Sequence, residues 1–280
     1  MDCQFGEKTY ETHMNIEWGS IGTNFAPNPR LEKVMGVDSI FYIDDYPITV
    51  LGSFYNGVIL TPDLWKDPKG LLIEERIPNL LMNLFIQYKT NDYISRSNGK
   101  DYSVWGKPYY RHYIKNVEQL DVLCDLENKI GNDAFVAYAF PACWETDVLL
   151  RRHEKRKVVV NSNYAFPSKL RGHSRYTFTH GGAYGRGFSE ESIIEKIDLQ
   201  KTINRIAEIR KKKVYFIDFI NETYKSIYNI MNETKGSYSS FFSAALEKTP
   251  AFDYEYQRQL DTIFNFCRIV GISWQVLGQK

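Results

Sequence analysis

The residue pattern changes character near residue 188, and this change constrains the fold more than any other feature of the chain. Before it, short β-rich runs alternate with helical patterns, whereas residues 190–233 and 237–275 carry Ile, Leu and Phe at helical spacing with few turn signals. The pattern predicts an α/β (α+β) fold in two parts. A mixed β-sheet flanked by helices is expected over residues 1–188, and a helical C-terminal region over residues 189–280.

Hydrophobic periodicity predicts the individual elements. Tyr10, Met14 and Trp18 recur at helical spacing and indicate a first helix with one apolar face. Further signals come from β-branched and aromatic runs bounded by turn residues. The expected helices cover residues 6–18, 71–82, 117–130 and 145–154, and the expected strands cover residues 36–43, 47–51, 56–60, 83–89, 134–140, 157–161 and 176–179.

Charge is balanced overall but segregated along the chain. The sequence has 35 Lys and Arg against 34 Asp and Glu, which excludes a globally basic nucleic-acid coat and an acidic disordered chain. Residues 1–80 hold 6 basic and 12 acidic side chains, whereas residues 151–175 hold 8 basic side chains and only Glu154 as an acid. Phosphate binds to local patches. The basic middle of the chain is therefore expected to contact nucleic acid.

Cysteine usage and the apolar segments predict the compartment. The four cysteines lie far apart without a CxxC pair, which argues against a zinc knuckle or a disulfide framework and favours a reducing compartment. The first residues lack the layout of a signal peptide, and the longest uncharged apolar stretch, Ala134–Trp144, is too short to span a bilayer. We therefore expect a cytoplasmic protein with no membrane partner.

Three polar residues on apolar strands predict a site for phosphate chemistry. Gln87 and Lys89 lie two positions apart and therefore share one face of a strand, about 7 Å apart. Asp38 lies in another apolar strand, where a buried carboxylate is costly unless it is paired or binds a cation. Asp38 and the Gln87 carbonyl suit Mg²⁺ as ligands, and Lys89 suits the scissile phosphate.

At these residues the sequence resembles a known family. G-V-D before an apolar strand that ends in Q-Y-K resembles the PD-(D/E)XK nuclease superfamily, in its Mrr-like variant with Gln in place of an acid. The segments PNPRLEKVMGVD, PYYRHYI and VAYAFPACW extend the resemblance, over about residues 5–190, to bacterial proteins associated with restriction and phage defence. The resemblance implies a nuclease core and a further metal-binding Glu on the first helix. Glu17 matches that position best, with Glu11 as the alternative.

We therefore expect a metal-dependent endodeoxyribonuclease that acts in antiviral defence, with Mg²⁺, or Mn²⁺ instead, held by Asp38, Gln87 and Glu17. Because Asp38 and Gln87 are 49 positions apart, Asp63, Glu74 or Glu75 compete for the role of Asp38. The alternatives are an RNA nuclease and a non-catalytic nucleic-acid-binding or regulatory subunit with a decayed nuclease fold. The helical region is expected to form a homodimer or to bind another defence protein. DNA is expected to contact Arg111, His112, Arg151, Arg152, Lys155, Arg156, Arg171 and Arg175.

Other hydrolytic chemistries find no support in the sequence. The five histidines show no HExxH or comparable metal spacing, and no GxSxG nucleophile elbow is present. The glycines of residues 180–192 fit neither GxGxxG nor a P-loop. Zinc hydrolysis, acyl transfer and nucleotide binding at a P-loop are therefore not expected.

Overall fold

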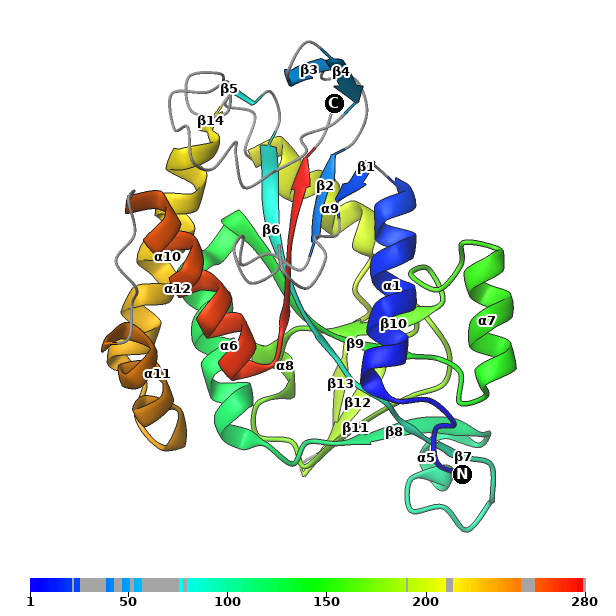
Figure 1. Ribbon diagram of the computed structural model, residues 1–280. Helices are drawn as coiled ribbons and strands as arrows, with labels where there is room; N and C mark the ends of the chain where they lie inside the picture. The colour runs from blue at the N-terminus through cyan, green and yellow to red at the C-terminus, as the bar shows by residue number, and fades with distance from the viewer. Residues whose placement is uncertain are drawn as a thin grey trace. The chain divides into compact units, whose positions relative to one another are not determined.

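The chain was analysed as a computed structural model, which has the predicted α/β fold with a helical C-terminal region (Figure 1). The described residues are 1–21, 23–25, 39–42, 47–50, 53–56, 76–77, 80–189, 191–209, 214–247 and 255–278.

The helices and strands follow one another in a mixed order. The chain-order bounds are α1 Glu7–Ile21, β1 Thr23–Phe25, β2 Ser39–Tyr42, β3 Pro47–Val50, β4 Ser53–Asn56, β5 Arg76–Ile77, β6 Leu80–Tyr88, β7 Asp92–Ile94, α5 Tyr102–Trp105, β8 Tyr109–Tyr113, α6 Val117–Ile130, η1 Gly131–Asp133, β9 Ala134–Pro141, α7 Thr146–Glu154, β10 Ser162–Ala165, α8 Pro167–Leu170, β11 Arg175–Phe178, β12 Gly185–Phe188, β13 Ser192–Ile194, α9 Leu199–Ile209, β14 Val214–Tyr215, α10 Phe216–Glu233, α11 Ser237–Glu247, α12 Glu255–Val270 and β15 Ser273–Gly278.

The chain divides into two compact units built from alternating segments. The expected division at residue 188 coincides with no boundary between them, because residues 189–202 belong to the first unit. The first unit comprises Met1–Trp18, Ile86–Cys124 and Val136–Thr202, and the second comprises Gly19–Phe85, Asp125–Phe135 and Ile203–Lys280.

A six-stranded mixed sheet has the strand order β1-β2-β15-β6-β9-β10. β15 pairs with β2 in parallel, with Gln275 opposite Ser39, whereas β1 with β2 and β9 with β10 are antiparallel. Every residue of β9 is buried, as expected for its uninterrupted apolar sequence. The sheet contains β6, and Lys89 follows directly after the end of that strand.

A five-stranded antiparallel sheet lies within the first unit, in the order β13-β12-β11-β8-β7. One of its faces packs against the core, where Phe140 lies 5.1 Å from Tyr176 and 5.3 Å from His112 between ring centroids. Because side chains alternate along a strand, Arg111 is on the opposite face from His112. Arg111 is therefore on the face turned away from this core.

The helical part of the second unit packs through aromatic and amide side chains. Phe242 of α11 stacks on Phe266 of α12 with ring centroids 5.6 Å apart. The Gln259 side-chain amide of α12 donates to the side-chain oxygen Oδ1 of Asn221 in α10 at 3.2 Å. Among the described residues, no helix is long and apolar enough to cross a membrane. All four cysteines are free thiols.

Two predicted elements are wrong. The helix expected over residues 71–82 is replaced in its described part by strand β5 and the start of β6. Residues 157–161 form turns instead of a strand, because the Asn161 and Ser162 amides donate to the Lys157 and Val159 carbonyls. The predicted C-terminal helices are present, but β13, β14 and β15 were not predicted within that region.

Candidate active-site pocket

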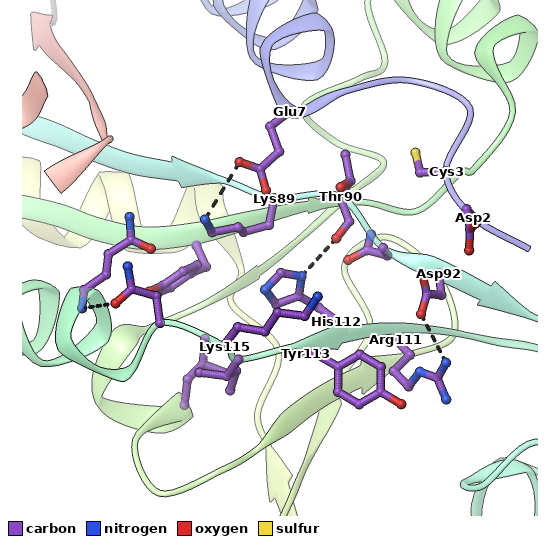
Figure 2. A pocket seen from close by; sticks show the side chains of 16 residues that line it. Asp2, Cys3, Glu7, Lys89, Thr90, Asp92, Arg111, His112, Tyr113 and Lys115 are labelled. Carbon is purple, nitrogen blue, oxygen red and sulfur yellow. Dashed lines mark hydrogen bonds and ion pairs between the residues drawn. The ribbon is translucent and has the colours of Figure 1, made fainter. Parts of the chain in front are cut away.

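A cavity of about 540 Å³ lies within the first unit, beside the end of β6 (Figure 2). Its walls come from the start of the chain and α1, the segment after β6, strands β7 and β8, and the start of α6. It combines basic, acidic and amide side chains, which is a composition suited to a polar ligand. The cavity is lined by Asp2, Cys3, Glu7, Lys89, Thr90, Asn91, Asp92, Arg111, His112, Tyr113, Ile114, Lys115, Asn116, Gln119, Tyr138 and Leu170.

Lys89 is the most deeply placed lysine of this pocket. Its side chain is 16% exposed, and its backbone N–H donates to the Ala139 carbonyl at 3.0 Å, which fixes the main chain. Burial lowers the pKa of Lys89, and the Glu7 carboxylate, 3.8 Å from the ammonium, opposes this effect. An ammonium that has lost most of its water favours an anion nearby.

Two more basic groups from β8 and the segment after it line the same cavity. Arg111 donates to the Asp92 carboxylate at 3.1 Å, and its guanidinium lies 4.7 Å from the centre of the Tyr113 ring. Lys115 is exposed and precedes α6. At the start of that helix the Asn116 side chain accepts from the Gln119 backbone N–H at 2.9 Å. Arg111 is therefore held in place, whereas Lys115 extends from the rim.

His112 is an uncharged pocket residue near neutral pH. Its Nδ1 lies 2.9 Å from the Thr90 carbonyl oxygen, so the neutral ring carries its proton on Nδ1 and donates it there. Burial lowers the pKa of His112 to about 4, and the cations Lys89 and Lys115 lower it further against the opposing Thr90 bond and Asp92 charge. His112 was predicted to contact DNA as a basic residue, but a neutral ring supplies no charge for that contact.

The low pKa of His112 predicts acid sensitivity of the fold. Its pKa is about 4 in the folded chain against an ordinary value of 6.5. Below pH 6.5 His112 is therefore protonated in the unfolded chain but still neutral in the folded chain. The free energy of unfolding falls as the pH falls towards 4. Between pH 7 and pH 5 we expect the wild type to lose about 2 kcal/mol more than His112→Asn. Urea unfolding at both pH values measures this difference, and equal losses would contradict a neutral His112 ring in the folded chain.

Gln87 was predicted to face the same site as Lys89, and the structure places it behind a second amide. Its side chain is 5% exposed and does not line the cavity. Its carbonyl oxygen accepts from the Gln119 amide at 3.0 Å, and its own amide donates to the Tyr88 carbonyl at 3.2 Å. The oxygen proposed for the metal therefore already has a hydrogen-bond donor, and that donor, Gln119, lines the cavity in its place.

Glu17, which was expected at the metal, accepts hydrogen bonds from two backbone amides. It is 4% exposed, and its two carboxylate oxygens accept the N–H groups of Val158 and Val159. Burial raises the pKa of Glu17, and these two bonds oppose the shift. Glu17 does not line the cavity beside Lys89. Glu11, the alternative on the same helix, forms an ion pair with Lys8 at 3.2 Å.

The carboxylate of α1 that does reach Lys89 is Glu7, which sequence reasoning missed. Its only signal was its position in the first turn of the expected helix. Asp38 and its alternatives Asp63, Glu74 and Glu75 lie outside the described residues. Among the residues that the structure describes, no three His, Cys, Asp or Glu side chains are grouped to hold a metal ion.

The residues predicted to contact DNA fall into two groups. Arg175 forms an ion pair with the buried Asp101, and Arg171 pairs with Asp121 at 2.8 Å, so neither is an unpaired surface charge. Along and after α7, Arg151, Lys155 and Arg156 are exposed, whereas Arg152 is partly buried. The exposed basic surface of this region is thus centred on the end of α7.

Comparison with known proteins gave no relative of this chain. No family model matches it, and no curated protein and no solved structure matches it.

Proposed function

We propose that the chain is a Mg²⁺-dependent endonuclease that hydrolyses DNA phosphodiester bonds at the pocket beside Lys89. The observation that carries the proposal is the mostly buried Lys89 ammonium, which lines a polar cavity at the end of a central strand. A fixed cation that has lost most of its water stabilises the charge that develops on a phosphate more strongly than a cation in water does.

The other pocket cations have supporting roles in this proposal. Arg111, held by Asp92, and the exposed Lys115 would bind the phosphates on either side of the one at Lys89. The N-terminus of α6 adds a partial positive charge at the same wall. Phosphate recognition therefore depends on side chains that the structure describes.

The described residues supply less of the metal-binding part of the proposed site than of its phosphate-binding part. When bound, Mg²⁺ or Mn²⁺ would activate the attacking water, with Asp38 as its first proposed ligand. The described residues do not complete a metal shell, because the Glu17 oxygens and the Gln87 oxygen already accept hydrogen bonds. The reaction is therefore proposed to depend on carboxylates that lie outside the described residues.

The proposed substrate partner is DNA, and its backbone would follow the exposed basic groups Arg151, Lys155 and Arg156 beyond the pocket. The helices of the second unit would form a homodimer or bind a defence protein. The role in antiviral defence depends on the family resemblance alone.

Replacement of Lys89 tests the proposal. With plasmid DNA and Mg²⁺, we expect Lys89→Met to cut at least about 100-fold more slowly than the wild type, because it removes a preorganised cation. Lys100→Met, at an exposed lysine outside both the pocket and the basic segment 151–175, serves as the matched control and should cut at the wild-type rate. Asp38→Asn and added EDTA test the metal in the same assay.

Two results would overturn the proposal. If the wild type leaves plasmid, linear and single-stranded DNA intact with Mg²⁺ and with Mn²⁺, the chain is not this enzyme. If Lys89→Met cuts as fast as the wild type, the reaction takes place elsewhere. Parallel reactions with RNA separate a ribonuclease from a deoxyribonuclease.

A second candidate function is a non-catalytic nucleic-acid-binding or regulatory subunit. It is favoured by the hydrogen bond from the Gln119 amide to the Gln87 side-chain oxygen, because that oxygen is the one expected to bind the metal. In that case Lys89→Met would bind DNA more weakly than the wild type, and rising salt would weaken DNA binding by the wild type. Neither the wild type nor any variant would cleave DNA, with or without metal.

A further inference from the structure

We infer that Glu7 is an internal competitor for the phosphate site, which pairs with Lys89 when the pocket is empty and is displaced when a phosphate group binds. The inference deepens the proposed function and depends on it for the class of ligand, an oxyanion of the phosphate type. It assigns Glu7 a regulatory role at the same pocket, where neither metal binding nor catalysis is required of it.

The two partners differ in burial. The Lys89 side chain is 16% exposed and the Glu7 side chain 48%, and their charged atoms are 3.8 Å apart. Hydrogen bonds between N and O span about 2.7–3.2 Å, so this pair is an ion pair without a direct hydrogen bond. A carboxylate at the rim therefore compensates a buried ammonium only in part.

A phosphate group would compensate the pocket more fully than Glu7 does. It carries up to two negative charges and several acceptor oxygens, and it can contact Lys89 and Lys115 together with the α6 N-terminus. Arg111 already has Asp92 as its partner at 3.1 Å, which leaves Lys89 as the buried cation with the weaker counter-ion. Displacement of Glu7 therefore exchanges a weak contact for a stronger one.

Glu7 can leave Lys89 without disturbing the fold. It is the first residue of α1, and its side chain is 48% exposed, so the carboxylate can turn into solvent. A carboxylate in the first turn is also stabilised by the helix dipole. After displacement, the charge would rest at the N-terminus of α1 and in solvent.

The Glu7–Lys89 contact (Figure 2) is tested by titrating inorganic phosphate into the full chain by calorimetry. Because Glu7→Gln removes the competitor, we expect it to bind phosphate about 2–5-fold more tightly than the wild type. Glu11→Gln is the matched control on the same helix, since Glu11 pairs with Lys8 and lies outside the cavity lining. It should bind phosphate as the wild type does, and Lys89→Met should lose most of the affinity.

Cys3 provides a second measurement at the same pocket. It lines the cavity, and it is the one cysteine of the four that is not buried. Phosphate should slow alkylation of Cys3 by iodoacetamide, at a lower phosphate concentration in Glu7→Gln than in the wild type. Melting curves without phosphate confirm that each variant is folded.

Unchanged or weaker phosphate binding by Glu7→Gln, with a folded variant, would overturn the inference, and a weaker affinity would point to Glu7 as a ligand or a structural residue. This outcome is separable from failure of the proposed function. If no DNA is cut but Glu7→Gln binds phosphate more tightly, the nuclease proposal fails and the competitor role stands.

Discussion

Replacement of Arg175 by alanine is expected to lower the free energy of unfolding by about 3–5 kcal/mol, because it leaves a buried carboxylate without its counter-ion. The Arg175 guanidinium donates from Nε to Asp101 at 2.9 Å and from a second nitrogen to the other carboxylate oxygen. Asp101 is 2% exposed. The guanidinium also lies 4.5 Å from the centre of the Phe188 ring. Urea unfolding of the full chain measures the loss.

The exposed pair of Arg171 with Asp121 is the matched control. Its N–O distance is 2.8 Å, but its side chains are 55% and 45% exposed, and such pairs contribute less than about 1 kcal/mol. Arg171→Ala should therefore be nearly neutral. In the double variant Asp101→Leu with Arg175→Met, no buried charge is left unpaired. It should be more stable than Arg175→Ala.

Equal losses for Arg175→Ala and Arg171→Ala would contradict a buried ion pair in the first unit. The result also bears on DNA recognition, for which both arginines were predicted from the charge pattern. If Arg175 acts as the structure indicates, its replacement weakens DNA binding only as far as it unfolds the chain. The basic groups around Arg151, Lys155 and Arg156 then remain for the phosphate backbone.

Local periodicity predicted the elements whose pattern is long and regular. The α6 helix has the predicted bounds, 117–130, and β9 covers the predicted apolar run 134–140. β15 was not predicted, because six residues at the end of a helical region carry little local signal. It pairs in parallel with β2, more than 200 positions away in the chain, and such pairing depends on contacts that no short window contains.

The pocket shows the same limit at the level of single side chains. Lys89 was predicted as a site residue because it lies two positions after Gln87 at the end of an apolar strand. Arg111 and His112, which were predicted to contact DNA, line the same cavity as Lys89. The partner of Lys89 depends on where α1 begins in space, whereas the family resemblance pointed to Glu17, with Glu11 as the alternative, and did not consider Glu7. The low pKa of His112 likewise arises from burial, which its hydrophilic surroundings in sequence do not indicate.

Replacement of Glu17 by alanine is expected to lower the free energy of unfolding by about 2–5 kcal/mol, since two buried amide donors lose their acceptor. Glu17 joins α1 to the turn at Val158 and Val159, 141 and 142 positions away. The Tyr164 hydroxyl and the Ser162 hydroxyl donate to the carbonyls of the same two valines at 3.0 and 2.7 Å. Both the N–H groups and the carbonyl groups of Val158 and Val159 therefore have side-chain hydrogen-bond partners.

The decisive comparison for Glu17 is made in EDTA, where a metal ligand and a structural carboxylate give opposite results. If Glu17 holds the turn, Glu17→Ala loses stability without any metal, and Glu154→Ala, at an exposed glutamate of α7, stays within about 0.5 kcal/mol of the wild type. If instead Glu17→Ala is as stable as the wild type in EDTA and differs only when Mg²⁺ is added, Glu17 binds the ion. The hydrogen bonds to Val158 and Val159 would then contribute little to the stability of the fold, because their loss in Glu17→Ala would not lower the free energy of unfolding in EDTA.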